Sequence, residues 1–197
     1  MNRIFVLSPA YCAGKRSRIL LGPEAEFGLA QRLRSESGAP LGELFSFLSG
    51  LYFRGKLTYS CAFACPPPGV PGIVVITPSR GLMVPSEPLH LERLQEFAEV
   101  EIGLAERRFR EPLVQSAQCL ALQLREDCEV VLLGSIATGK YVDILASIFN
   151  DRLSENNDFF TFLSVQSRTS TMLITLSWSC SSNNDIPFKS FTRLSLF

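Results

Sequence analysis

A chain of 197 residues with 46% hydrophobic and 19% charged side chains suits one globular domain, which excludes disorder of the whole chain. The 19 Lys and Arg balance the 19 Asp and Glu, so no overall field attracts nucleic acid or an anionic membrane. The apolar stretch after Arg3 is too short for an export signal, and no run approaches the roughly 18 apolar residues that span a bilayer. We therefore expect a cytoplasmic protein that does not enter a membrane.

The balanced total hides an uneven distribution of charge. Residues 1–60 carry eight Lys or Arg against four Glu, whereas residues 77–130 carry six Arg against ten Asp or Glu. The N-terminal part is therefore the better place for an anionic ligand, although two solvated faces of opposite sign would give the same pattern.

The cysteines are scattered and form no C-x-x-C pair. Cys61 and Cys65 are four positions apart, but His90 is the only histidine that could join them, so we expect no metal centre and no cofactor. The apolar sequence around Cys61 and Cys119 predicts buried thiols in a reducing compartment.

The first half of the chain begins with a short apolar run. Residues 3–7 predict a buried strand that ends at Ser8, and a loop follows. Periodic apolar residues and an early proline predict a helix over 24–34, and a second helix is expected over 41–53, broken by Gly55. The proline-rich segment 66–72 predicts a stiff connector without regular structure.

The second half alternates apolar strands with helical patterns. Residues 73–76 are continuously apolar, as expected of a parallel strand covered on both faces, and residues 129–133 predict a third apolar strand that Gly134 ends. Helices are predicted over 91–109, from Pro112 to residue 124, and over 137–149. Strands joined through helices imply crossover connections, so we expect a three-layer α/β fold with a mostly parallel sheet flanked by helices.

The last 47 residues differ in composition from the rest. No glycine follows Gly139 and no alanine follows Ala146, whereas Ser, Asn, Thr and Phe become frequent. We therefore predict an α/β domain over 1–150 and an atypical Ser/Asn-rich tail over 151–197, produced by a frameshift, a fused segment or drift and either disordered or unrelated in fold. A β-hairpin formed by residues 159–165 and 171–178 is the alternative.

The carboxyl ends of the predicted strands suggest where a ligand binds, because ligands of parallel α/β sheets bind beyond these ends. Hydroxyl groups, basic side chains and backbone amides of the loops that begin at Ser8, Thr77 and Gly134 suit a phosphate-bearing ligand, a nucleotide or nucleic acid. The candidate ligand-binding residues are Ser8, Lys15, Arg16, Thr77, Ser79, Arg80, Gly134, Ser135, Gly139, Lys140 and Tyr141.

Residues 134–140 fit the phosphate-loop pattern G-x-x-x-x-G-K between a predicted strand and a predicted helix. Tyr141 stands where a Ser or Thr would hold magnesium, and no later strand ends in Asp, which disfavours a nucleoside triphosphatase. The same backbone amides could hold another anion, and a tight turn without any ligand is the simplest interpretation.

Two residues are candidates for catalysis in a small-molecule hydrolase or transferase. Cys12 lies three residues before Lys15, whose charge would lower the thiol pKa, and His90 is the only imidazole that could serve as its base. A loop cysteine and a capping histidine are the structural alternatives. A non-catalytic interaction module that uses the acidic helix over 91–110 is a third possibility.

A group of cations among aromatic residues occurs in the helix predicted around residue 50. Arg54 and Lys56 alternate with Tyr52, Phe53 and Tyr59, and such groups can hold phosphate and stack on bases. The same aromatic residues also have the spacing of a helix face that packs into the core.

Four short segments carry a resemblance to a known family. The segments LSGLYFRG over 48–55 and ITPSRGLMVP over 76–85 occur with VLLG over 131–134 and KYV over 140–142. Together they resemble a bacterial α/β family related to the peroxide-stress DNA-binding proteins and to the glycosylase-like domain of archaeosine synthase. The resemblance covers about residues 2–148.

The resemblance implies a glycosylase-like fold and a link to nucleic acid or nucleobases. The connector 66–71 and two residues inside the turn, Pro78 and Arg80, depart from the family pattern, so it assigns no catalytic residue. The matched positions are Thr77, Ser79, Gly81, Leu82, Pro85, Gly134 and Tyr141.

Overall fold

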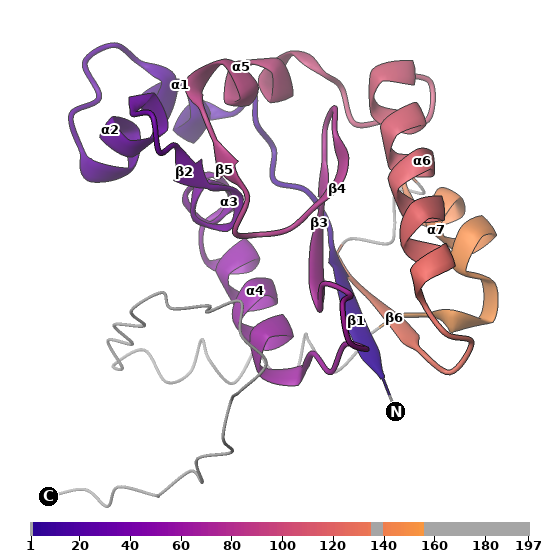
Figure 1. The fold of residues 1–197 in the computed structure, drawn as a ribbon. Helices are drawn as coiled ribbons and strands as arrows, with labels where there is room; N and C mark the ends of the chain where they lie inside the picture. Colours follow the sequence, from indigo (N-terminus) through magenta and orange to yellow (C-terminus); the bar gives the residue numbers. More distant parts are fainter. Residues whose placement is uncertain (1, 135–139, 156–197) are drawn as a thin grey trace, which may run out of the picture.

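The fold is an α/β sandwich around a mostly parallel sheet, seen in a computed structural model that describes residues 2–134 and 140–155 (Figure 1). The sheet has the order β4-β3-β1-β6-β7, with β1 paired in parallel to both β3 and β6, β7 parallel to β6, and β4 antiparallel to β3. Its strands are β1 (Arg3–Leu7), β3 (Ile73–Thr77), β4 (Gly81–Met83), β6 (Glu129–Leu133) and β7 (Leu153–Glu155).

The three central strands are buried on both faces, which explains why apolar residues fill them except at one end, where Arg3, Thr77 or Glu129 stands. In β1, Phe5 and Leu7 pack into the core on one face, whereas Ile4 and Val6 pack into the core on the other. The strand pattern, the parallel pairing and the α/β class predicted from the sequence are confirmed.

One face of the sheet is covered by the N-terminal helices and a small accessory sheet. Aromatic contacts organise this layer: the ring of Phe45 meets the edges of Phe53 and Phe97 at centroid distances of 5.5 and 6.3 Å. The elements are α1 (Lys15–Leu21), α2 (Gly28–Arg34), α3 (Leu41–Ser49), α4 (Leu51–Phe63) and α5 (Leu91–Glu99), with β2 (Ala39–Pro40) paired to β5 (Pro88–Leu89).

The opposite face is covered by α6 (Arg107–Gln123) and α7 (Val142–Phe149), which lie side by side in Figure 1. A short 3-10 turn, η1 (Asn150–Arg152), connects α7 to β7. The paired strand β7 therefore extends the sheet five residues beyond the boundary expected at residue 150. The hairpin considered for 159–165 and 171–178 lies outside the described residues.

Helix boundaries in the first half differ from the prediction. Lys15 and Arg16, expected in a loop, begin α1, and the helix expected from residue 24 begins only at Gly28. The long helical pattern after residue 41 breaks at Gly50, whose φ of 64° no helix allows, while Gly55 remains inside α4. Composition alone did not distinguish these two glycines.

The helix predicted over 91–109 is two helices. It ends at Glu99, and α6 begins after Glu106, whose carboxylate accepts a hydrogen bond of 3.0 Å from the amide of Arg108. Pro112, predicted as a helix start, lies inside α6. The acidic stretch over 91–110 is therefore no continuous interaction helix.

Among the described residues no helix is long and apolar enough to cross a membrane.

The turn between β3 and β4 contacts α6 closely. Gly81 has a φ of 64°, and a Cβ there would collide with the carbonyl of Pro112 and the hydroxyl of Ser116. The same hydroxyl accepts a hydrogen bond of 2.9 Å from the amide of Leu82. The turn therefore requires glycine both for its backbone conformation and for its contact with the helix.

The substitution Gly81→Ala should destabilise the fold by roughly 2 kcal/mol or more, because strain and the collision add. Gly103→Ala is the matched control, since a Cβ there meets nothing within 4 Å. Urea unfolding followed by circular dichroism measures both. Equal midpoints for the two variants would contradict this account of the turn.

Candidate functional site

The ends of β1 and β6 meet at Ser8 and Gly134. The amide of Ser8 donates a hydrogen bond of 2.9 Å to the carbonyl of Leu133, so the ladder between the strands continues one residue past their ends. Both residues are buried, and a Cβ on Gly134 would collide with the side chain of Ser8. Two of the predicted loops therefore start side by side, and residue 134 must be glycine for Ser8 to keep its position.

Lys56 reaches this point from α4. Its Nζ atom donates a hydrogen bond of 2.9 Å to the carbonyl of Ser8 and lies 2.6 Å from the hydroxyl oxygen of the same residue. The side chain is 1% exposed, and Nζ stands 4.9 Å from the ring centre of Tyr52 and 5.0 Å from that of Phe53. Tyr52 is one helical turn before Lys56, so both project from the same face of α4.

Tyr141 completes the group from the opposite layer. It is the N-cap residue of α7 and is 5% exposed. Its hydroxyl is hydrogen bonded to the side chain of Ser8 and would lie 3.2 Å from a Cβ placed on Gly134. We call Ser8, Lys56, Gly134 and Tyr141 the Ser8 cluster. It lies at the carboxyl edge of the sheet, where helices from both faces meet.

Burial controls the protonation of the cluster. It lowers the pKa of Lys56 to about 7, because the dry surroundings disfavour the ammonium form. No carboxylate of the described residues forms an ion pair with this lysine. Burial raises the pKa of Tyr141, and the hydrogen bond with Ser8 opposes part of that rise. Near neutral pH the lysine is therefore present both as ammonium and as amine, while the phenol keeps its proton.

The hydrogen bonds have a different direction in each state. An ammonium has three donors and no acceptor, so Lys56 then donates to both oxygens of Ser8. A neutral amine has one lone pair, so Lys56 can accept the proton of the Ser8 hydroxyl while it still donates to the carbonyl. The lysine thus decides where the hydroxyl proton of Ser8 points.

The loop after β3 is engaged in its own turn. The hydroxyl of Thr77 donates to the carbonyl of Gly81 at 2.8 Å and accepts from the amide of Arg80 at 3.1 Å. Ser79 and Arg80 both bind Glu96 of α5, at 2.5 and 3.0 Å. These predicted ligand residues therefore fix a hairpin turn against α5.

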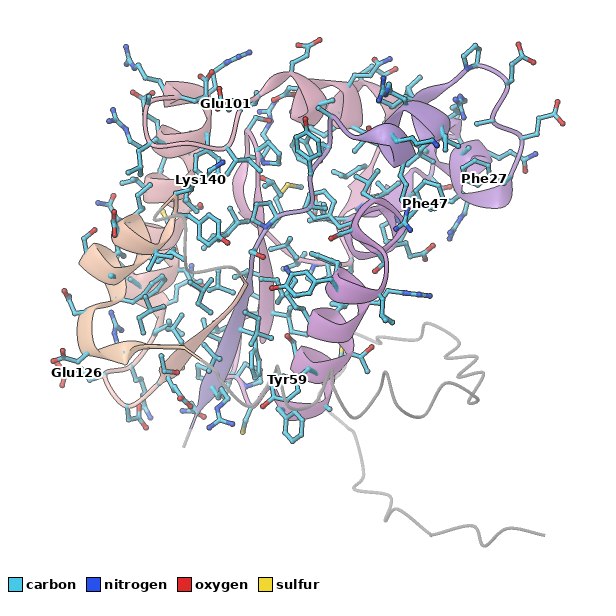
Figure 2. The ribbon with its side chains drawn as sticks, turned by 180° about the vertical axis from the view of Figure 1, so that it is seen from behind. Phe27, Phe47, Tyr59, Glu101, Glu126 and Lys140 are labelled. Atoms are coloured by element: carbon cyan, nitrogen blue, oxygen red, sulfur yellow. The ribbon has the colours of Figure 1, made fainter. Side chains whose placement is uncertain are left out.

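The remaining predicted cations are not gathered into one site. Arg16 donates a hydrogen bond of 3.3 Å to the carbonyl of Phe47 and lies over Gly50, so it caps the C-terminus of α3. Lys15 is exposed at the start of α1. Lys140 is exposed beside the buried Tyr141, above the carboxyl ends of the strands in Figure 2. Ser135 and Gly139 of the phosphate-loop pattern lie outside the described residues.

Neither catalytic candidate from the sequence has the expected environment. Cys12 is 2% exposed and donates a weak hydrogen bond of 3.5 Å to the carbonyl of Ala10, and burial raises its pKa to about 12. The predicted lowering of this pKa by Lys15 is therefore wrong. His90 is exposed, and its Nδ1 lies 3.2 Å from the carbonyl of Ser35. The thiols of Cys61 and Cys119, expected to be buried, are exposed.

Comparisons of the chain with protein-family models, with curated proteins and with solved structures found no significant match. In the described part of the chain, no group of three or more His, Cys, Asp and Glu is placed to hold a metal ion. The Ser8 cluster is the candidate functional site because it combines a buried cation with two hydroxyls at the ligand-binding edge of the sheet.

The sequence located Ser8, Gly134 and Tyr141 but did not place Lys56 with them. A lysine inside an apolar helical face, between Phe53 and Leu57, was the available signal. The aromatic group considered around it divides in the structure. Tyr52 and Phe53 flank Lys56, whereas Tyr59 packs on Phe5 and Phe63 at 5.9 and 4.6 Å and lies near the opposite end of the sheet in Figure 2.

Cys12 should resist thiol reagents in the native protein near neutral pH, because its thiol is buried and protonated. Mass spectrometry after brief iodoacetamide treatment should show Cys119, which is exposed, modified at least about tenfold faster. Both should react alike in urea. Faster modification of Cys12 than of Cys119 in the native state would restore it as a catalytic candidate.

The stability of the protein should rise with pH from about 7 to about 9, because the unfolded Lys56 holds a proton that the folded one has lost. Above about pH 9 the unfolded Cys12 loses a proton that the buried thiol keeps, and this opposes the rise. The slope approaches ~1.4 kcal/mol per pH unit in this window, and the full penalty of the buried ammonium persists below it. Lys56→Met should remove the rise, whereas Lys15→Met, at an exposed position, should keep it. Urea unfolding across the window tests this, and parallel curves for the wild type and Lys56→Met would refute it.

Proposed function

We propose that the chain binds a phosphate-bearing ligand, a nucleotide or a nucleic-acid phosphate, on the Ser8 cluster. The observation that carries the proposal is Lys56, which is 1% exposed and has no carboxylate partner among the described residues. A buried ammonium without a counter-charge is costly, and an anion that enters the site removes most of this cost. The positive charge of Lys56 is therefore not balanced by a described carboxylate, and an anion in the site would balance it.

The neighbouring groups suit a phosphate. Ser8 and Tyr141 supply hydroxyl donors next to Lys56. Gly134, which packs against Ser8, is the first residue of the sequence 134–140 that fits a phosphate loop. The position beyond the carboxyl ends of β1 and β6 is where open parallel sheets bind their ligands.

Two features favour a nucleotide over inorganic phosphate. The ring of Tyr52 lies half-buried beside Lys56, and an aromatic side chain is a group on which a base can stack. Lys140 adds an exposed positive charge next to Tyr141. These positions support electrostatic attraction of a nucleic-acid backbone towards the edge of the sheet.

The family resemblance supports the same class of ligand. Gly134 and Tyr141, two of the positions that match the family pattern, belong to the Ser8 cluster, whereas Thr77 and Ser79 belong to the hairpin turn. A glycosylase-like fold with a nucleobase or nucleic-acid ligand is the form of the proposal that this resemblance favours.

A thymidine dinucleotide is a suitable probe, because its single phosphodiester keeps one negative charge throughout the pH range of interest. Its affinity, measured by calorimetry, should fall by roughly tenfold or more between about pH 6 and pH 8.5, as Lys56 loses the proton that pairs with the phosphate. Lys56→Met should lower the affinity near pH 6 by about tenfold or more and abolish the pH dependence.

Arg80→Gln is the matched control, because it also removes one positive charge but from a side chain already paired with Glu96. It should change the affinity by about threefold at most. An unchanged affinity in Lys56→Met, or equal losses in the two variants, would contradict the proposed site.

A further inference from the structure

We infer that Ser8 is a nucleophile and Lys56 its general base, in a centre that transfers acyl groups from carboxylic esters or thioesters. This activity goes beyond ligand binding at the Ser8 cluster. The hydroxyl oxygen of Ser8 lies 2.6 Å from Nζ of Lys56, and the hydroxyl of Tyr141 is hydrogen bonded to the same oxygen. Serine–lysine pairs recur on unrelated folds as a nucleophile with its base.

A serine hydroxyl is a weak nucleophile unless a base within hydrogen-bond distance accepts its proton. Lysine serves as this base only when it is a neutral amine, which needs a dry site without carboxylates. Lys56 is buried and has no carboxylate partner in the part of the chain that the structure describes, which fits this condition. The groups that face its Nζ atom are Ser8 at the end of β1 and the rings of Tyr52 and Phe53 on its own helix, and Tyr141 lies on the other side of Ser8. Burial lowers the pKa of Lys56 to about 7.

The base is also oriented by a third group, as in catalytic triads. The bond from Nζ to the carbonyl of Ser8, at 2.9 Å, holds one N–H of Lys56 and leaves the lone pair of the amine directed at the hydroxyl. The amide of Ser8 is fixed to Leu133, and Gly134 packs against its side chain. The nucleophile is therefore held at the end of a buried strand by several contacts.

The reaction follows from these positions. The Ser8 oxygen bonds to the acyl carbon as its proton passes to Nζ of Lys56, and the carbonyl oxygen takes up the electron pair of the C=O bond. When the carbonyl reforms, the bond to the alcohol or thiol breaks, and Lys56 returns the proton to the leaving oxygen or sulfur. Water then attacks the acyl-serine with Lys56 again as base, which releases the carboxylic acid and restores Ser8.

Tyr141 has a distinct part in this step. Its phenol keeps its proton at neutral pH because burial raises its pKa. When Lys56 accepts the proton of Ser8, the phenol can donate a hydrogen bond to the Ser8 oxygen and hold this oxygen in position for its attack on the acyl carbon. Lys56 binds anions as the ammonium but activates Ser8 as the amine, so a phosphate ligand and the acyl step compete for opposite states of one side chain.

Covalent labelling of the full chain with a fluorophosphonate tests the inference. Peptide mapping near pH 8.5 should locate one adduct, on Ser8, and the rate should rise as the pH passes through about 7. Ser8→Ala should abolish labelling, Lys56→Met should slow it by about a hundredfold or more, and Tyr141→Phe by about tenfold. Circular dichroism and urea midpoints verify that each variant is folded.

Ser79 provides an internal control in the same digest, because its hydroxyl is bonded to Glu96 and has no lysine base. p-Nitrophenyl acetate gives a second readout: a burst of one nitrophenolate per chain, with acetate on the Ser8 peptide. No adduct on Ser8 with either the fluorophosphonate or the smaller acetyl ester would overturn the inference. So would a rate in folded Lys56→Met equal to that of the wild type.

The proposed phosphate ligand and the proposed nucleophile can be refuted independently of each other. Ser8 labelling that depends on Lys56, without any affinity for the dinucleotide, supports the nucleophile and removes the phosphate ligand. Dinucleotide affinity that depends on Lys56, with Ser8 unlabelled, removes the nucleophile and keeps the ligand site. If both hold, the dinucleotide should slow the labelling of Ser8, because it retains Lys56 as the ammonium.

Discussion

The contact between Lys56 and Ser8 connects the two halves of the structure. Helix α4 covers one face of the sheet and α7 the other, and the lysine and Tyr141 meet at the residue where β1 ends. The ammonium group loses its hydration when it is buried there, and the carbonyl and hydroxyl of Ser8 replace only part of it. The fold therefore maintains a polar, titratable group at the one edge of the sheet where a substrate would approach. Both the proposed ligand and the proposed chemistry depend on this buried lysine, whose lost hydration is only partly replaced.

The contacts of the other predicted ligand-binding cations show why counting charged residues in a sequence is a poor guide to a ligand site. Arg16 caps α3 through the carbonyl of Phe47, and Arg80 is neutralised by Glu96. Each satisfies a requirement of the fold itself, a helix C-terminus in one case and a hairpin turn in the other. The surplus of positive residues before residue 60 thus includes Arg16, which has a structural role. It also includes Lys56, a buried lysine at the sheet edge that has no carboxylate partner among the described residues.

The sequence predicted the core strands well because only burial on both faces explains such continuous apolar runs. It also predicted Ser8, Gly134 and Tyr141, because the carboxyl ends of parallel strands share one edge. The predicted ends of the helices were wrong where they depend on backbone conformation. Of Gly50 and Gly55, which look alike in the sequence, only Gly50 has a positive φ. Lys56 was not placed because its partner is 48 residues away, and no periodicity states which strand end a helix will cover.

The antiparallel hairpin of β3 and β4 places β4 at one outer border of the sheet. An outermost strand normally presents unsatisfied amides to which a foreign strand can add. Here the Leu82 amide is already occupied by the Ser116 hydroxyl, and α6 stands against the strand at Gly81. A helix side chain thus takes the place that an invading backbone would need, and a foreign strand cannot pair with β4 at Leu82 unless it displaces Ser116.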